Sequence, residues 1–116
     1  MYFASKLFET PWSIETRLRC GARFKECIQS YDPDLVVSLH PLCQNLPLTI
    51  MKGLGMRGRE PKRRVPFAVV CTDLGGAHPS WFKRDVDACF VPSDAVRDVA
   101  RRRGVDDGKI IQHGLP

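Results

Sequence analysis

The sequence lacks several features that would place it quickly in a functional class. No stretch approaches the roughly 20 consecutive apolar residues that a membrane-spanning helix needs. The N-terminal residues show no basic region followed by an apolar one, so neither a secretory signal nor a transit peptide is visible. The phosphate-binding pattern GxxxxGK[ST] is absent, and the one GxGxxG run, residues 53–58, follows a predicted helix instead of a strand, which argues against a free-standing nucleotide-binding domain.

Cysteine pairs with metal-ligand spacing are also missing. The five cysteines form no CxxC motif, and their number is odd. Several fall within predicted helices or strands, where a reduced cysteine behaves as a small apolar side chain. We therefore expect a reducing compartment and no metal site. The cysteines are Cys20, Cys27, Cys43, Cys71 and Cys89.

The remaining composition is that of one globular domain. The chain has 116 residues, 43% of them hydrophobic, which is enough for one modest core. The formal net charge of +5 suggests an anionic partner. Charge alone does not choose among phospholipid head groups, a nucleotide and nucleic acid.

Helical and strand patterns alternate along the chain. Residues 1–12 show no decisive period and predict an irregular lead-in, and Pro11 with Ser13 predicts the start of a helix that ends at Asp32. We expect helices at 14–31, about 46–54 and 94–103, buried strands at 35–39, 67–71 and 87–91, and a fourth short strand at 109–112. This order predicts an α/β fold, a partial Rossmann-like parallel sheet with flanking helices.

Polar side chains follow each predicted strand. They are His40, Asp73 with His78, Ser93, and His113, and all three histidines of the chain come after a strand. The carboxyl ends of parallel strands meet at one edge of a sheet, where open α/β sheets bind ligands. We therefore expect these side chains to share one edge.

The stretch FAVVCTDLGGAHPSW contains most of this candidate edge. Gly75 and Gly76 would let the backbone turn sharply or approach a ligand closely. His78 either contacts a ligand or fixes its own loop by a hydrogen bond. Asp73 either orients His78 and the ligand or holds a turn through its own backbone. Trp81 suits a membrane interface or ordinary core packing.

A basic segment, RGREPKRR, lies between the second predicted helix and the second strand. It contains five of the 18 Lys and Arg residues. It is either a solvated connection or a contact with an anionic membrane surface. Nucleic acid is disfavoured because no aromatic residues interleave the charges. The five are Arg57, Arg59, Lys62, Arg63 and Arg64.

Four segments together resemble a known family. The runs PDLVVSLHPLCQNLPL, VVCTDLGGAHPSWF, VPSDAV and KIIQHGLP are similar to the N-terminal domain of plant-type monogalactosyldiacylglycerol synthases, and bacterial diacylglycerol glucosyltransferases are similar in the TD…H…W region. The resemblance covers about residues 20–116. It implies a GT-B glycosyltransferase of two Rossmann-like domains, in which the N-terminal domain takes diacylglycerol at the membrane and the C-terminal domain binds the UDP-sugar. It also implies an inverting transfer without a bound metal, with a general base deprotonating the lipid hydroxyl.

The resemblance identifies residues 13–116 as an incomplete acceptor domain. The family's glycine-rich loop with its histidine, and the UDP-sugar domain, have no counterpart in this sequence, and no catalytic base can be matched. We therefore do not expect this chain alone to catalyse transfer, and the alternative is a non-catalytic lipid-binding or interaction remnant. The implied acceptor-binding residues are His78, Trp81, Asp73, His40 and Pro79.

The same resemblance implies the partners and the compartment. We expect hexose transfer, with galactose from UDP-galactose, to diacylglycerol, and peripheral contact with a membrane that contains anionic lipid. We expect no nucleic acid and no cofactor held by this chain. The chloroplast envelope is the implied location, or the cytoplasmic side of the inner membrane for a bacterial protein.

Overall fold

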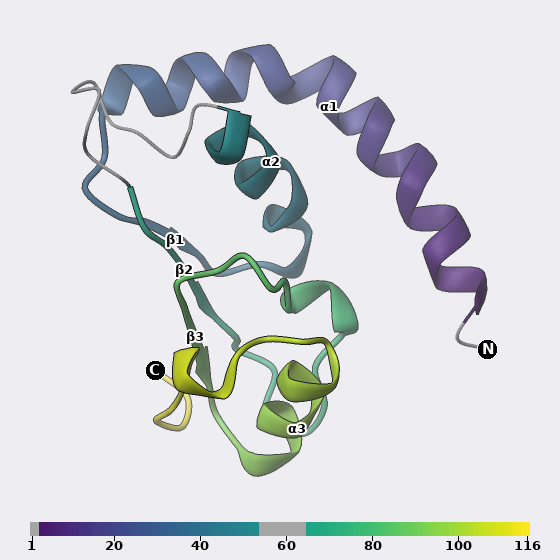
Figure 1. Ribbon diagram of the computed structural model, residues 1–116, viewed down its shortest axis with the longest axis vertical. Helices are drawn as coiled ribbons and strands as arrows, with labels where there is room; N and C mark the ends of the chain where they lie inside the picture. Colours follow the sequence, from purple (N-terminus) through teal and green to yellow (C-terminus); the bar gives the residue numbers. More distant parts are fainter. Residues whose placement is uncertain (1–2, 54–64) are drawn as a thin grey trace.

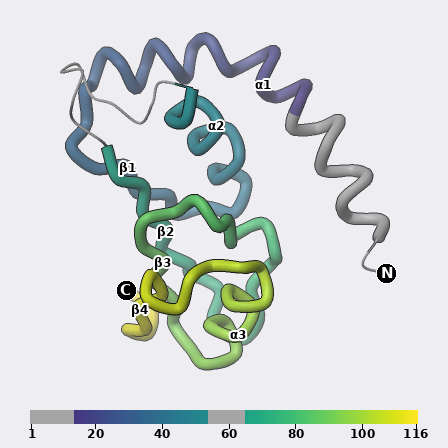
Figure 2. Tube along the Cα trace, in the orientation of Figure 1, coloured from purple at the N-terminus to yellow at the C-terminus, as the bar shows by residue number. Residues whose placement is uncertain are grey.

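The computed structural model describes residues 3–53 and 65–116, with side chains from residue 14 onward. It confirms the predicted α/β class: one sheet of four parallel strands, in the order β1-β2-β3-β4, is flanked by helices (Figure 1; Figure 2). The helices are α1 (Phe3–Tyr31), α2 (Asn45–Gly53) and α3 (Asp94–Arg102), and the strands are β1 (Val36–Ser38), β2 (Phe67–Val70), β3 (Ala88–Val91) and β4 (Ile110–Gln112). Three short 3-10 turns are η1 (Pro41–Cys43), η2 (Pro79–Trp81) and η3 (Asp107–Lys109).

The register of the sheet separates its two faces. Ala68 of β2 lies opposite Val37 of β1 and Ala88 of β3, and Val70 lies opposite Phe90. Side chains alternate along a strand, so these residues share one face and their neighbours share the other. The second face forms the core and is covered by α2, η2 and α3. The core includes Phe67, Val69, Cys71, Trp81, Phe82, Cys89, Val91, Val96 and Ile110.

The boundaries of α3 follow the predicted signals. Ser93 Oγ accepts from the backbone N–H of Val96 at 3.4 Å, so it caps the helix as expected. Gly104 follows the helix with φ 85°, a left-handed conformation that favours glycine. Asp32 ends α1 with φ 44° before Pro33, which cannot extend a helix.

The predicted start of α1 is wrong. The helix begins at Phe3, so the segment expected to be an irregular lead-in is helical and Pro11 lies inside the helix instead of near its start. Helix extension is cooperative, so the helix continues on both sides of Pro11 and also through Gly21. The expected apolar face is also only partly used, because Ile14 and Leu18 are exposed. The partner helix α2 has nine residues against 29 in α1 and is too short to cover it.

The prediction that β1 is a buried strand is wrong as well. β1 lies at one edge of the sheet, and Val37 is 47% exposed, with Leu35 and Leu39 exposed beside it. An apolar run signals burial on both faces, but the described residues supply neighbours for β1 on one side only. β2 and β3, which lie inside the sheet, are buried as expected.

Candidate functional site

The segments that follow the parallel strands meet at one edge of the sheet, as the topology predicts. The central contact joins two residues of the loop after β2. Trp81 Nε1 donates a hydrogen bond of 2.7 Å to Asp73 Oδ2. Trp81 is 1% exposed, so its ring packs in the core and does not reach the surface, whereas Asp73 is half-buried. The bond therefore closes the loop between the end of β2 and η2. Asp73 binds the core side chain of Trp81 and does not orient His78.

His78 occupies the exposed tip of this loop. Its Nδ1 accepts the backbone N–H of Ser80 at 3.2 Å and lies 2.7 Å from Ser80 Oγ. Because Nδ1 is the acceptor, a neutral ring in this arrangement has its proton on Nε2. The exposed nitrogen of His78 is then a hydrogen-bond donor to a ligand oxygen and has no free lone pair to act as a base. Pro79 follows it as the first residue of η2 and is half-buried.

His40 lies in a second turn, which has the same type of hydrogen bond to the histidine ring. It precedes Pro41, and its Nδ1 accepts the backbone N–H of Leu42 at 3.2 Å. The two turns, η1 and η2, pack against each other. Two exposed histidines therefore cap neighbouring His-Pro turns, and the same geometry makes the Nε2 of His40 a donor.

A buried polar pair supports η1, and sequence reasoning missed it. Gln44 is fully buried, and its Nε2 donates to Ser38 Oγ at 3.0 Å and to the carbonyl oxygen of His40 at 3.3 Å. Ser38 Oγ donates in turn to the carbonyl oxygen of Cys43 at 3.0 Å. These bonds fix the backbone of the turn that presents His40. The available signal was a glutamine placed directly before an apolar helix.

Ser93 ties the end of β3 to the same loop. Its Oγ donates to the carbonyl oxygen of Leu74 at 2.8 Å, in addition to capping α3. His113 shares the edge because it follows β4, and its backbone N–H donates to Val91 at 3.2 Å. Its exposed side chain lies beyond the outermost strand. The site therefore centres on the ends of β1 and β2.

The two glycines of the loop are not required by the backbone. Neither Gly75 nor Gly76 has a positive φ, and a Cβ added to either would meet nothing within 4 Å. The turn in this loop therefore does not require glycine at either position. Open space above both residues leaves room for the close approach of a ligand.

The raised pKa values of two nearby cysteines indicate that these residues have a structural role. Burial raises the pKa of the Cys89 thiol to about 12, and burial also raises the pKa of Cys71, which directly precedes the loop. Both thiols stay protonated near neutral pH, so neither is a nucleophile. Within the described side chains, no group of three or more His, Cys, Asp or Glu residues is placed to hold a metal ion.

Two further features concern the membrane. The five basic residues predicted to contact a membrane surface (Arg57, Arg59, Lys62, Arg63 and Arg64) fall outside the described residues. No helix in the described part of the chain combines the length and the apolar character needed to span a bilayer.

Comparison with known proteins agrees with the resemblance. The family model described as monogalactosyldiacylglycerol (MGDG) synthase matches residues 8–116. Probable monogalactosyldiacylglycerol synthase 2, chloroplastic, of Oryza sativa subsp. indica is 42% identical over 89 residues, which are 77% of this chain and 18% of that protein. The chloroplastic synthase of Spinacia oleracea is 37% identical and synthase 1 of Arabidopsis thaliana 35% identical, over 77% of this chain and 16% of each relative. The chain thus spans less than a fifth of the relatives it matches.

Proposed function

The chain belongs to the monogalactosyldiacylglycerol synthase family, and from that premise we propose that it forms acceptor-side structure of a glycosyltransferase. The enzyme transfers galactose from UDP-galactose to the hydroxyl of diacylglycerol. The observation that carries the proposal is the family match over residues 8–116, which includes every strand end of the candidate site. In this proposal the sugar nucleotide binds in the second, C-terminal domain of the GT-B fold.

The geometry suits a lipid that has a hydroxyl group and little else that is polar. His40 and His78 place donor Nε2 atoms on neighbouring turns. Leu42, 64% exposed, and Leu74, 56% exposed, lie on the same two loops. Diacylglycerol offers a hydroxyl and ester oxygens to such donors and acyl chains to such leucines.

Each acceptor-site residue has a distinct role in this proposal. His78 and His40 donate to oxygen atoms of the glycerol backbone. Asp73 and Trp81 set the shape of the loop through their mutual hydrogen bond, and Pro79 fixes the turn that follows His78. With Nδ1 as the acceptor, the Nε2 atoms of His40 and His78 are donors, so neither histidine is assigned as the general base that deprotonates the lipid hydroxyl.

The proposal extends to the membrane. The net charge of +5 favours an anionic surface. The five basic residues of RGREPKRR would contact anionic lipid while the protein stays peripheral. The relatives are named chloroplastic, and the envelope membrane is the proposed location. The second candidate function is a non-catalytic lipid-binding or interaction remnant, for which the exposed Leu42 and Leu74 would supply the lipid contact.

A chimera tests the proposal. Residues 8–116 replace the matching segment of the rice synthase 2, and galactose transfer from UDP-galactose is measured on vesicles that contain diacylglycerol. Transfer by the folded chimera is the expected result. A folded chimera without transfer contradicts the acceptor role. If the 116-residue chain then still sediments with the same vesicles, the lipid-binding remnant is supported instead.

A further inference from the structure

Two polar side chains are buried in the described part of the protein, and they bind each other. Ser38 is 5% exposed and Gln44 is 0% exposed, and among the described side chains these are the buried polar ones. Gln44 Nε2 lies 3.0 Å from Ser38 Oγ. Burial of polar groups opposes folding unless hydrogen bonds compensate for it. The bonds that this pair makes therefore indicate what the pair is for.

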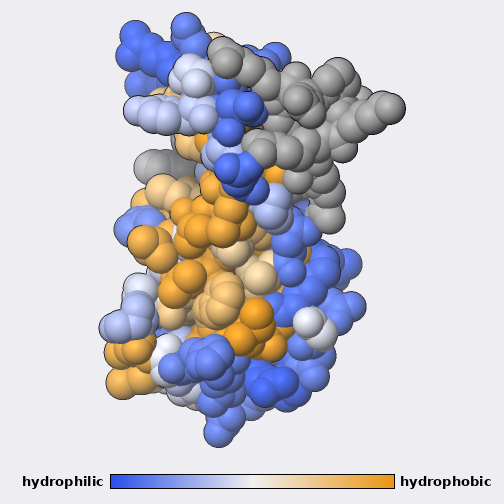
Figure 3. Space-filling view, turned by 90° about the vertical axis from the view of Figure 1, so that its left-hand side faces the viewer, coloured by the Kyte–Doolittle hydropathy of each residue, from blue (hydrophilic) through white to orange (hydrophobic). Residues whose placement is uncertain are grey.

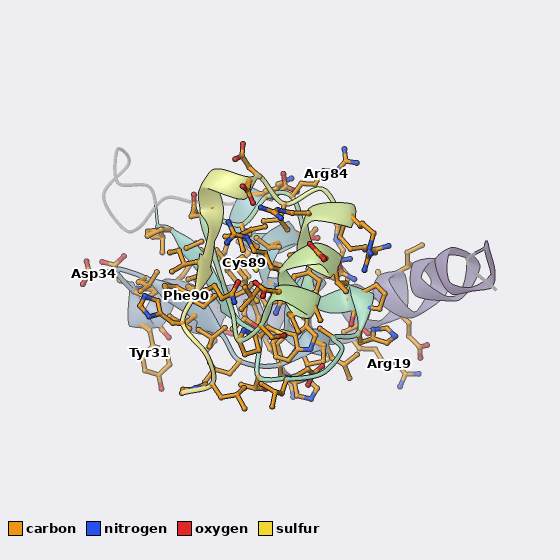
Figure 4. The ribbon with its side chains drawn as sticks, turned by 90° about the horizontal axis from the view of Figure 1, so that it is seen from below. Arg19, Tyr31, Asp34, Arg84, Cys89 and Phe90 are labelled. Carbon is orange, nitrogen blue, oxygen red and sulfur yellow. The ribbon has the colours of Figure 1, made fainter. Side chains whose placement is uncertain are left out.

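The surroundings of the pair are apolar. The register places Ser38 opposite Val69, on the face of the sheet that also carries Cys89. Cys89 and Phe90 lie on opposite sides of the sheet (Figure 4), and the side of Phe90 shows a band of apolar residues (Figure 3). In β1, β2 and β3, Ser38 is the one residue with a hydroxyl, amide or charged side chain. An apolar residue would suit the packing here, which points to a role for the polar groups themselves.

The hydrogen bonds determine the orientation of the Gln44 amide. The other neighbours of Ser38 Oγ are two carbonyl oxygens, that of Cys43 at 3.0 Å and that of His40 at 3.3 Å. The hydroxyl proton goes to a carbonyl, so Oγ accepts from Gln44 and Nε2 must face it. The second N–H of Nε2 binds the carbonyl oxygen of His40 at 3.3 Å. Both N–H groups of Gln44 are thus used to hold the segment that contains His40.

The other end of the amide has no partner. Gln44 Oε1 is buried and meets no donor among the residues that the structure describes. An unpaired buried oxygen destabilises the folded state. The groups that Gln44 binds have other partners, because the carbonyl oxygen of His40 also accepts the N–H of Cys43 at 3.0 Å and Ser38 Oγ also donates to the carbonyl oxygen of Cys43. The fold therefore loses little if an apolar group replaces this amide.

We propose that Gln44 is a positioning residue, which fixes the direction of the His40 ring towards the lipid acceptor. The inference rests on the proposed function, in which His40 Nε2 donates to the acceptor. Ser38 ends β1, and the carbonyl oxygen of Gln44 accepts the N–H of Leu48 in α2 at 3.2 Å. The amide thus ties the backbone of His40 to two rigid elements, while the N–H of Leu42 orients the ring. A donor held in this way needs little ordering when the acceptor binds.

Gln44→Met in the rice chimera tests the proposal. The melting temperature stays within about 2 °C, because methionine fills the same space and removes the unpaired oxygen. The KM for diacylglycerol rises about fivefold, with kcat and the KM for UDP-galactose unchanged, because the ring of His40 is no longer fixed. Thr49→Val exchanges an exposed polar group for an apolar one on α2. It is the control and changes none of these values.

His40→Ala shows whether Gln44 acts through the ring. This variant keeps the carbonyl oxygen that Gln44 binds and removes the imidazole. Gln44 then has no ring to position, so adding Gln44→Met raises the KM for diacylglycerol no further. A residue that only supports the fold would raise the KM by the same factor with and without the ring.

The ring of His40 also gives a signal that does not depend on transfer. The ¹⁵N chemical shifts of a histidine ring show which nitrogen carries the proton, and they are measured for the 116-residue chain at about pH 8.5, where imidazole is neutral. In the unsubstituted chain, His40 carries the proton on Nε2, because Nδ1 is an acceptor. Gln44→Met moves the two shifts of His40 towards each other as the ring exchanges between tautomers. The shifts of His78 stay unchanged.

Four results overturn the inference. They are unchanged ring shifts of His40 in Gln44→Met, an unchanged KM for diacylglycerol in an active Gln44→Met chimera, and a rise in KM that is the same with and without the His40 ring. The fourth is a fall in melting temperature together with equal changes in kcat and both KM values, which assigns Gln44 to the fold alone. A chimera without transfer whose His40 shifts still respond to Gln44→Met contradicts the proposed function and supports the positioning of His40 by Gln44.

Discussion

The indole N–H of Trp81 donates to the carboxylate of Asp73 across 2.7 Å, and this bond fixes the loop that presents His78. The two residues are eight positions apart, one at the exit of β2 and one in the core. The loop is thus anchored at both ends, and the residues between the two anchors, including Leu74 and His78, are largely exposed. A loop held at both ends is suited to binding, because little ordering is needed when a ligand arrives.

Trp81→Phe should lower the free energy of unfolding by about 3 kcal/mol, because it removes a donor to a charged group and leaves a cavity. Asp73→Asn should cost only about 1 kcal/mol, because an amide oxygen still accepts the bond. Urea unfolding followed by far-ultraviolet circular dichroism measures both. An equal loss of unfolding free energy in the two variants would show that the hydrogen bond between Trp81 and Asp73 does not hold the loop.

Gly75→Ala and Gly104→Ala should change stability in opposite directions. At Gly75 the added methyl meets open space and φ is not positive, so reduced freedom of the unfolded chain stabilises by about 0.5 kcal/mol. At Gly104, φ is 85° and the methyl would lie 2.6 Å from Arg84 Nε, so the protein is destabilised by about 1 kcal/mol or more. Thermal melting of the two variants side by side is sufficient, and a destabilising Gly75→Ala would contradict the described loop.

Ser93→Ala should cost about 1–2 kcal/mol, because one hydroxyl both caps α3 and binds the carbonyl oxygen of Leu74. Ser30→Ala is the matched control: that hydroxyl makes a single exposed bond to the carbonyl oxygen of Cys27. Chemical denaturation should show a clear loss for the first variant and almost none for the second. Similar losses would mean that Ser93 does not join β3 to the site.

Alkaline unfolding should depend on Cys89. Its pKa is raised by burial from 9.0 to about 12 in the folded protein, so its contribution to stability is complete below pH 9 and is lost as the pH rises towards 12. Cys89→Val removes this titration and should shift the midpoint of alkaline unfolding upward. Cys43→Ser, at an exposed cysteine, should leave the midpoint in place. A midpoint that is unchanged in Cys89→Val would show that another group controls alkaline unfolding.

The strands were predictable because a buried parallel strand is a short apolar run with an abrupt polar end. That signal gave β2, β3 and the residues at their exits, including Asp73 and Ser93. The helix ends were predictable where a local residue determines them, as Ser93 and Gly104 do. The family resemblance also followed from local segments, four in all, among them the run from Thr72 to Phe82.

Other features depend on contacts that no sequence window contains. A tryptophan beside basic residues suits both a surface and a core, and the packing around η2 decides that Trp81 is buried. The exposure of β1 depends on which strands pair with it. The tautomer of His78 depends on where the N–H of Ser80 points, which pattern and composition do not reveal.

The most direct test of the proposed acceptor site is the steady-state kinetics of the rice chimera with His78→Ala. If His78 binds the acceptor as a donor, the apparent KM for diacylglycerol rises about tenfold, in keeping with the loss of one hydrogen bond. The KM for UDP-galactose stays unchanged, and His78→Gln, which retains an N–H donor, recovers part of the loss. Arg101→Ala, on α3 in a surface ion pair with Asp107, is the control. An unchanged KM for diacylglycerol in His78→Ala would contradict the placement of the acceptor site at this edge of the sheet.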